Sequence, residues 1–175
     1  MTKNNLYDME WIKVDSNKIH HTAIIFENVK LGKNNVIGPY TVLGGNGEIR
    51  GKNQEDFKGT VEIGDNNVIS EHVTIQRPFD EGFKTVIGDN NIIMAHSHIG
   101  HDAIIGDNTE ICTTTIIGGY AKVEDNVKIK LGCIVRNRVT IGEGSIIGMG
   151  SSVVSDIEKK SVAFGSPAKV KRKVE

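Results

Sequence analysis

Three histidines and an aspartate lie close together near the middle of the sequence. His96, His98 and His101 are followed at once by Asp102, in a chain that has only six histidines. An imidazole titrates near about pH 6.5 and can take a proton from a hydroxyl or an amine at neutral pH. A neighbouring carboxylate can fix the imidazole tautomer and stabilise the cation that forms. The cluster therefore indicates a general base at His101 oriented by Asp102, although histidines without a role on a polar surface are the simpler interpretation of any single one.

A repeat of six residues surrounds this cluster and must position it. Every sixth residue from Ile87 to Val153 is aliphatic, the same phase reaches back to Ile63, and an earlier block from Ile19 to Leu43 has the same period in another phase. This period fits neither a helix, with roughly 3.6 residues per turn, nor a strand that alternates about every second residue. It is typical of a solenoid. Gly, Asn and Asp after the aliphatic positions suit sharp corners, so we expect three hexads to close a triangular coil and the coils to stack as parallel strands.

Coil stacking makes a geometric prediction about the base. Residues 18 apart lie one above the other on adjacent coils of three hexads, so Gly119 is expected against His101. A backbone N–H there could polarise a thioester carbonyl beside the base, as in an oxyanion hole. The sequence signals no serine or cysteine nucleophile, and direct transfer without a covalent enzyme intermediate is the simplest scheme.

Two stretches interrupt the repeat. Residues 44–60 (GGNGEIRGKNQEDFKGT) change its phase, whereas residues 77–84 (RPFDEGFK) replace one aliphatic position with Glu81 and preserve it. Loops that leave rigid solenoids are often functional, so two neighbouring excursions predict a binding rim. The sequence thus predicts an N-terminal cap at 1–17, an all-β parallel β-helix at 18–157 with a loop excursion near 44–60, and a short C-terminal tail at 158–175.

The two ends lie outside the repeat. We expect an apolar contact at the N-terminal end to cap the first coil, since terminal coils expose an unpaired strand edge. The tail ends in a basic cluster, for which a solvated charged terminus is the simplest interpretation. The cap residues are Leu6, Met9, Trp11 and Ile12, and the cluster is Lys169, Lys171, Arg172 and Lys173.

The composition restricts the class of protein. A formal net charge of -1 gives no reason to expect nucleic acid as a partner. The apolar run needed for a membrane span or a signal peptide is not present. Cys112 and Cys133 form no disulfide framework. These features predict a reduced, cytoplasmic protein.

With these motifs the sequence resembles the hexapeptide-repeat acyltransferases, whose fold is a left-handed β-helix, and among them the UDP-N-acetylglucosamine O-acyltransferases of lipid A synthesis. The resemblance runs from Ile19 to Val153, and HSHIGHDAIIGDN is its most specific segment. It implies that His101 is the catalytic base with Asp102 as its orienter, that Gly119 is the oxyanion donor, and that His98 contacts the acceptor. The segment NQEDFKG implies acceptor contacts at Asp56 and Lys58.

The sequence departs from that family at several positions. Gln76, Tyr120 and Arg136 stand where the family has histidines, although Arg77 is retained. We expect Gln76, Arg77 and Tyr120 near the acceptor and Arg136 near the cofactor. In place of the family's C-terminal helical region stands FGSPAKVKRK, which resembles the end of coenzyme A-dependent sugar and antibiotic acetyltransferases. That resemblance implies cofactor contacts at Gly165, Ser166, Pro167, Ala168 and Lys169.

The expected function is transfer of an acetyl or short acyl group to a hydroxyl or amine of a sugar, with a nucleotide-linked sugar preferred. Acetyl-CoA or another acyl-CoA is the expected co-substrate, and no metal is expected. The resemblance also implies a homotrimer with each active site between two subunits.

Three alternatives stay open. The donor can be an acyl carrier protein with a longer acyl chain, as in lipid A synthesis. A γ-type carbonic anhydrase shares the fold, and His96 and His101 have the spacing of two of its zinc ligands, but the third falls near Gln76, a poor ligand. The third alternative is a non-catalytic scaffold protein, because solenoids offer flat faces for binding other proteins.

Overall fold

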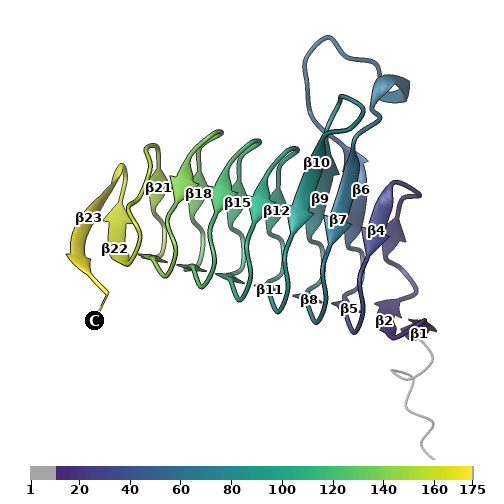
Figure 1. Ribbon diagram of the computed structural model, residues 1–175, viewed down its shortest axis with the longest axis horizontal. Helices are drawn as coiled ribbons and strands as arrows, with labels where there is room; N and C mark the ends of the chain where they lie inside the picture. The colour runs from purple at the N-terminus through teal and green to yellow at the C-terminus, as the bar shows by residue number, and fades with distance from the viewer. Residues whose placement is uncertain (1–10, 175) are drawn as a thin grey trace, which may run out of the picture.

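Three parallel sheets form the sides of a triangular prism (Figure 1). The computed structural model describes residues 11–174. Ile99 pairs with Ile117, Ile117 with Val135 and Val135 with Val153, so one complete coil takes 18 residues. The predicted left-handed parallel β-helix is confirmed.

The sheets are named A, B and C, and each coil except the last contributes one short strand to each sheet in that order. Sheet A consists of β1 (Trp11–Val14), β2 (Asn17–His20), β5 (Val36–Ile37), β8 (Val68–Ile69), β11 (Ile92–Ile93), β14 (Glu110–Ile111), β17 (Lys128–Ile129), β20 (Ile146–Ile147), β22 (Ser161–Gly165) and β23 (Ala168–Lys173). Sheet B consists of β3 (Ile24–Ile25), β6 (Val42–Asn46), β9 (Thr74–Arg77), β12 (His98–Ile99), β15 (Ile116–Ile117), β18 (Ile134–Val135) and β21 (Ser152–Val153). Sheet C consists of β4 (Val29–Leu31), β7 (Thr60–Ile63), β10 (Lys84–Ile87), β13 (Ile104–Ile105), β16 (Lys122–Val123) and β19 (Thr140–Ile141). A short 3-10 helix, η2 (Gln54–Asp56), lies between β6 and β7. No helix within residues 11–174 is long and apolar enough to cross a membrane.

The inward residues form a continuous aliphatic column. Ile99, Ile105 and Ile111, one from each side of the prism, are at most 1% exposed. Burying such a side chain contributes about 1.5–3 kcal/mol relative to leaving it in water. This column is the core that the six-residue period predicts.

A second column, of asparagines, fills the corner where sheet C turns into sheet A, the C–A corner. The side-chain oxygens of Asn17, Asn35 and Asn67 each accept the backbone N–H of the next asparagine, at 2.8 Å. Asn91 ends the series by accepting the N–H of Thr109 at 2.7 Å. Buried amides need such partners, so the ladder lets polar residues line a corner of the core.

The two excursions explain the behaviour of the repeat phase. Ile37 pairs with Ile69, 32 residues later, and Ile69 pairs with Ile93, 24 residues later. A spacing of 32 is not a multiple of six, so the phase shifts across the first excursion. A spacing of 24 is a multiple of six, so the second excursion preserves it.

Strands close both ends of sheet A. At one end β1, which includes Trp11 and Ile12, pairs antiparallel with β2, whereas Leu6 and Met9 lie outside the described residues. At the other end β22 continues the sheet in parallel with β20, and β23 folds back antiparallel onto β22.

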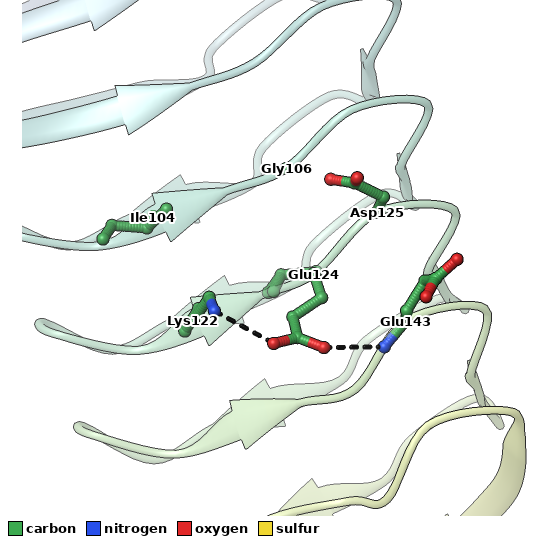
Figure 2. A pocket seen from close by; sticks show the side chains of 7 residues that line it. Ile104, Gly106, Lys122, Glu124, Asp125 and Glu143 are labelled. Atoms are coloured by element: carbon green, nitrogen blue, oxygen red, sulfur yellow. Dashed lines mark hydrogen bonds and ion pairs between the residues drawn. The ribbon is translucent and has the colours of Figure 1, made fainter.

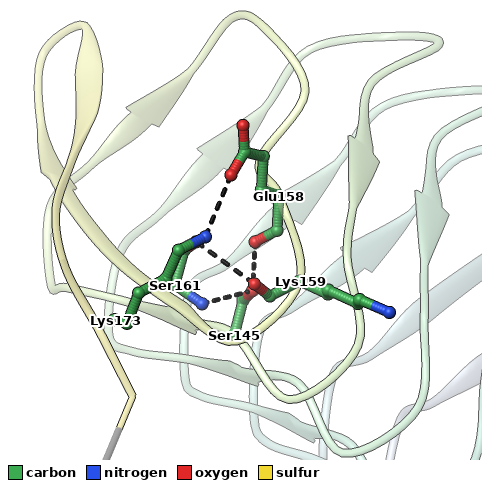
Figure 3. A network of polar contacts seen from close by, with 5 residues as sticks. All are labelled: Ser145, Glu158, Lys159, Ser161 and Lys173. Carbon is green, nitrogen blue, oxygen red and sulfur yellow. Dashed lines mark hydrogen bonds and ion pairs between the residues drawn. The ribbon is translucent and has the colours of Figure 1, made fainter.

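A polar network fastens β23 to the last coil (Figure 3). The ammonium of Lys173 donates to Glu158 at 2.9 Å and to the hydroxyl of Ser161 at 3.2 Å, and the hydroxyl of Ser145 donates to the carbonyl of Glu158 at 2.8 Å. The tail is thus an ordered hairpin, with the side chains of Lys169, Lys171 and Arg172 exposed. The boundary at residue 157 stays a prediction.

Candidate active site

Both excursions and the histidine cluster belong to the corner where sheet B turns into sheet C, the B–C corner. Residues 47–59 connect β6 to β7, residues 78–83 connect β9 to β10, and residues 100–103 connect β12 to β13. Figure 1 shows the two excursions rising from the same side of the prism. The second and third coils of this corner therefore carry a raised wall beside the fourth coil, which holds His101.

Two phenylalanines join the excursions. Phe57 is only 3% exposed, and its ring meets the ring of Phe79 edge to face at 5.1 Å between centroids. The ammonium of Lys52 lies 3.9 Å from the centre of the Phe79 ring. The sequence predicts the two loops but not this contact. Its only signal is a phenylalanine in each polar loop of a chain with five in all.

His101 and Asp102 form a paired base and carboxylate. His101 Nδ1 lies 2.7 Å from Asp102 Oδ2, and the two side chains are 15% and 6% exposed. A carboxylate only accepts hydrogen bonds, so Nδ1 carries the proton of the neutral ring. The lone pair is then on Nε2, which is the atom able to act as a base.

Two glycines hold the imidazole ring between them. A Cβ at Gly119 would lie 3.0 Å from Nε2 and Cε1 of His101, and a Cβ at Gly47 would lie 3.0 Å from its Cδ2. Gly119 lies where coil stacking predicts it. Gly47, in the first excursion, could not be placed from the repeat. Neither position has room for a larger residue while the ring keeps its place.

A cavity of about 400 Å³ opens beside this ring. Of the residues predicted for the site, it brings together His98, His101, Gly119 and Gln76. Its full lining is Glu48, Gln76, His98, Gly100, His101, Ile116, Gly118, Gly119 and Asn137. Sequence reasoning missed Glu48 and Asn137. The 18-residue register could have found Asn137, one coil beyond Gly119, whereas nothing in the repeat locates Glu48.

The polar groups around the cavity have shifted acidities. Burial lowers the pKa of His98, the neighbouring charge of Glu48 opposes that shift, and the ring nitrogen Nδ1 lies 2.7 Å from the Thr74 hydroxyl. Burial and the charge of Asp102 raise the pKa of Tyr120, whose ring meets the His101 ring edge to face at 5.2 Å. His98 is therefore neutral and Tyr120 protonated at neutral pH, so both can form hydrogen bonds to an uncharged substrate group.

Three residues predicted to contact the acceptor lie outside the lining of the cavity, two on the first excursion and Arg77 at the end of β9. Asp56 ends η2, and Lys58 follows it; both side chains are exposed. Arg77 Nε donates to Asn46 Oδ1 at 2.7 Å, and Asn46 Nδ2 donates to the carbonyl of Gln54 at 2.8 Å. Arg77 thus fastens the base of the first excursion.

Comparison with known proteins agrees with this architecture. Residues 84–119 match the family described as bacterial transferase hexapeptide (six repeats). Over these residues the chain carries the hexapeptide repeat of that family. The matched span includes His101, Asp102 and Gly119, the glycine that packs on the His101 ring.

Two proteins similar to this chain are both named as UDP-N-acetylglucosamine acyltransferases. An acyl-[acyl-carrier-protein]–UDP-N-acetylglucosamine O-acyltransferase of Pseudomonas paraeruginosa is 36% identical over 110 residues, which are 62% of this chain and 43% of that protein. The crystal structure of LpxA, a UDP-N-acetylglucosamine acyltransferase from Bacteroides fragilis, superposes with a TM-score of 0.84 at 30% identity, over 90% of this chain and 61% of that one. This chain thus spans less than half the length of the first relative and about three fifths of the length of the second.

A second solved structure shares the fold alone. PerB from Caulobacter crescentus, solved in complex with CoA and GDP-perosamine, superposes with a TM-score of 0.52 at 22% identity, over 89% of this chain and 57% of that one.

The residues predicted to bind a cofactor occupy two corners of the prism. Arg136 is exposed on the B–C corner, one coil beyond Gly118. The turn that contains Ser166 and Pro167 lies instead at the A–B corner, where sheet A turns into sheet B, because the N–H of Gly165 donates to Ser151 Oγ at 3.1 Å. The flanking Ala168 and Lys169 begin β23, with Ala168 buried and Lys169 exposed.

The histidine pair of the zinc alternative is separated by the fold. His96 lies on the A–B corner, where its ring stacks on His72 at 4.7 Å with an interplanar angle of 5°, whereas His101 pairs with Asp102 on the B–C corner. Across residues 11–174, no three His, Cys, Asp or Glu side chains are arranged to hold a metal ion. The contacts give the zinc alternative no support.

A second hollow, of about 270 Å³, lies on sheet C (Figure 2). Two of its side chains are paired: Lys122 donates to Glu124 at 2.9 Å, and Glu124 accepts the N–H of Glu143 at 3.1 Å. Its lining contains no histidine, whereas the cavity at the B–C corner is lined by His98 and His101 and is therefore the candidate active site.

Proposed function

We propose that this protein transfers an acyl group from a thioester donor to a hydroxyl or amine of a nucleotide-linked sugar. The observation that carries the proposal is the His101–Asp102 pair, 2.7 Å apart, with Gly119 packed on the base at the wall of a cavity. This combination supplies a base and a backbone donor for a developing oxyanion within one site.

The proposed reaction is a direct attack. Nε2 of His101 removes the proton as the sugar oxygen or nitrogen bonds to the thioester carbon. The N–H of Gly119, which donates to no protein group within residues 11–174, stabilises the negative charge on the carbonyl oxygen. The tetrahedral intermediate then breaks its carbon–sulfur bond, and the departing thiolate takes the proton from the imidazolium.

The proposed acceptor rests on the relatives and on the lining of the cavity. Both relatives above are named for UDP-N-acetylglucosamine. His98 and Gln76 line the cavity and offer hydrogen bonds to sugar hydroxyls, with Tyr120 beside the base. Asp56 and Lys58 would contact the acceptor from the excursion, whose base Arg77 fastens.

Two donors are candidates. An acyl-CoA is favoured by the segment Gly165 to Lys169, with Arg136 as a further cation for its phosphates. An acyl carrier protein is favoured by the names of the relatives. The turn at 165–169 and the base lie on different corners of one chain, and a homotrimer that places the turn of one subunit beside the base of another would join them.

Turnover with a donor panel tests the proposal. Acetyl-CoA, longer acyl-CoAs and the matching acyl carrier proteins are each incubated with UDP-N-acetylglucosamine and other nucleotide sugars, and the products are weighed by mass spectrometry. We expect one pair to give an acylated sugar and His101→Ala to lower the rate by about 10²–10⁴-fold. His96→Ala, a histidine outside the cavity, should keep the parent rate.

Three results would overturn the proposal. The first is a folded protein that acylates no acceptor in the panel. The second is a His101→Ala variant as active as the parent, which the scaffold alternative predicts. The third is CO₂ hydration by protein that binds zinc stoichiometrically, which the carbonic anhydrase alternative predicts.

A further inference from the structure

The backbone N–H of Asp102 has an unusual partner. At the same position of the next two coils, the N–H of Tyr120 donates to the carbonyl of His101 at 3.0 Å and that of Arg138 to the carbonyl of Gly119 at 3.1 Å. Asp102 shares their left-handed backbone, with φ of 61°. Its N–H donates instead to the side-chain oxygen of Thr85, at 2.8 Å.

The second excursion explains the exchange. By the spacing of the next two coils, the carbonyl acceptor for Asp102 would be that of Phe83. Phe83 belongs to the excursion, and its carbonyl accepts the N–H of Thr60 at 3.1 Å. The loop that raises the wall of the cavity thus removes the regular acceptor, and the hydroxyl of Thr85 replaces it.

Thr85 is built into this position. Its side chain is fully buried, and its hydroxyl donates to the carbonyl of Gln76 at 2.7 Å. Since the hydroxyl proton is committed to Gln76, the oxygen faces Asp102 as an acceptor. Two hydrogen bonds in the same direction therefore connect the N–H of Asp102 to the hydroxyl of Thr85 and that hydroxyl to the carbonyl of Gln76, a residue that lines the cavity.

We propose that Thr85 is a positioning residue for the base. By holding the backbone of Asp102 in its left-handed turn, Thr85 keeps the carboxylate on Nδ1 of His101 and so keeps the lone pair on Nε2. Residues that orient a functional group by a hydrogen bond, without touching the substrate, typically change activity by about 10–100-fold when altered. The inference about tautomer rests on geometry, and only its effect on rate rests on the proposed function.

The experiment compares three variants. Thr85→Val keeps the shape and removes the hydroxyl, and Thr85→Ser restores it. Thr41→Val is the matched control, because Thr41 is also fully buried and donates to a backbone carbonyl, that of Ser70, at 2.8 Å on the A–B corner. If Thr85→Val does not fold, Thr85→Ala takes its place.

Two readouts separate positioning from stability. Ring ¹⁵N NMR on histidine-labelled protein, with His101 assigned by its loss in His101→Asn, reports the tautomer. We expect Thr85→Val to populate the Nε2–H tautomer and to lower kcat at least tenfold with the acceptor KM unchanged, on the scale given for such orienting residues. Thr85→Ser should restore both, and Thr41→Val should change neither despite a similar loss of thermal stability.

The outcomes are distinct. A wild-type ring spectrum in the folded Thr85→Val or Thr85→Ala variant overturns the positioning role, whatever the enzyme assay gives. A changed spectrum in Thr41→Val does so as well, because the effect would then be one of general stability. If the parent protein transfers no acyl group, the proposed function fails, while the spectra still decide the role of Thr85.

Discussion

Position 119 requires glycine because of a contact. Its Cβ would lie 3.0 Å from His101 Nε2 and 3.1 Å from the carbonyl oxygen of the same residue, closer than ordinary van der Waals contact. We predict that Gly119→Ala displaces the ring and lowers kcat by at least about tenfold, since small misplacements of reacting groups are costly. Steady-state kinetics and a thermal melt measure this.

The control for that prediction is Gly45→Ala. A Cβ at Gly45 would meet only Val42 Cγ1, at 3.6 Å, which is an ordinary contact. This variant should retain the parent kcat. A Gly119→Ala variant with the parent kcat would contradict the packing described for the base.

His98 makes a prediction about pH and stability. Burial lowers its pKa below the ordinary 6.5, so the folded protein favours the neutral ring more strongly than the unfolded chain does. The unfolded chain then binds the extra proton first as the pH falls. The free energy of unfolding contributed by His98 is fully present above about pH 6.5 and declines below it, until the lower pKa of the folded state is reached.

Urea unfolding at pH 7.5 and 5.5 checks this prediction. We expect the parent to lose more stability between the two values than His98→Gln does. Equal losses would show that the ring is not desolvated in the folded protein. The comparison cancels the contributions of all other titrating groups that the two proteins share.

At the scale of single residues, the sequence predicted the contacts that follow from the 18-residue spacing between coils. The position of Gly119 against His101 follows from a fixed spacing. The same rule locates Asn137, although Asn137 was not among the predicted site residues. Gly47, Glu48 and Thr85 could not be assigned, because their contacts depend on the path of two excursions that no repeat constrains.

The two excursions behave as one element, joined by Phe57 and Phe79. We predict that Phe57→Ala loosens the contact between them, because its ring is buried against Phe79. The backbone bonds from Lys58 to Phe79 and from Gly59 to Pro78 remain and keep the loops adjacent. The acceptor KM should rise by about tenfold or more, since the wall of the cavity loses its fixed position. The melting temperature should change little, as these loops lie outside the aliphatic column.

Kinetics and limited proteolysis measure the effect. Cleavage within residues 47–59 should become faster in Phe57→Ala. Phe83→Ala removes a ring that is 54% exposed on the second excursion and should change neither quantity. Slow cleavage and an unchanged KM in Phe57→Ala would show that the loops hold their place independently.

The phase of the repeat predicted that both excursions exist but not how they fold. A shift of phase reports the number of inserted residues and nothing about their contacts. The pairing of Phe57 with Phe79 is a contact between two irregular segments, and such contacts are determined by three-dimensional packing rather than by local pattern.

Across the whole molecule, the asparagine ladder connects successive coils. Asn67 accepts the N–H of Asn91 at 2.8 Å in a buried contact and donates to the carbonyl of Gly88 at 2.9 Å in a partly buried one. Asn67→Ala leaves both groups without a partner, at about 1–3 kcal/mol each. We predict a loss of about 2–6 kcal/mol in the free energy of unfolding, measured by chemical denaturation.

Asn53→Ala is the matched control. Asn53 precedes η2 on the first excursion, is exposed and makes no side-chain capping bond. Its replacement should change stability by less than about 0.5 kcal/mol. A loss as large as that of Asn67→Ala would show that the ladder has no special share in stability.

The overall fold was the most predictable level of this protein. The column from Ile87 to Val153 has a period that only stacked triangular coils satisfy, and the three sheets follow it. The hairpin β22–β23 was not predicted, because its strands leave the period and its antiparallel pairing appears only in three dimensions.

The β22–β23 hairpin affects how copies of this protein can associate through the edge of sheet A. β23 is the last strand of sheet A, and such an edge is a template on which another chain can add a strand. Lys169, Lys171 and Arg172 are exposed along it. Two copies approaching edge to edge would bring these cations together, and their mutual repulsion discourages the growth of fibres from a rod that is otherwise well suited to polymerise.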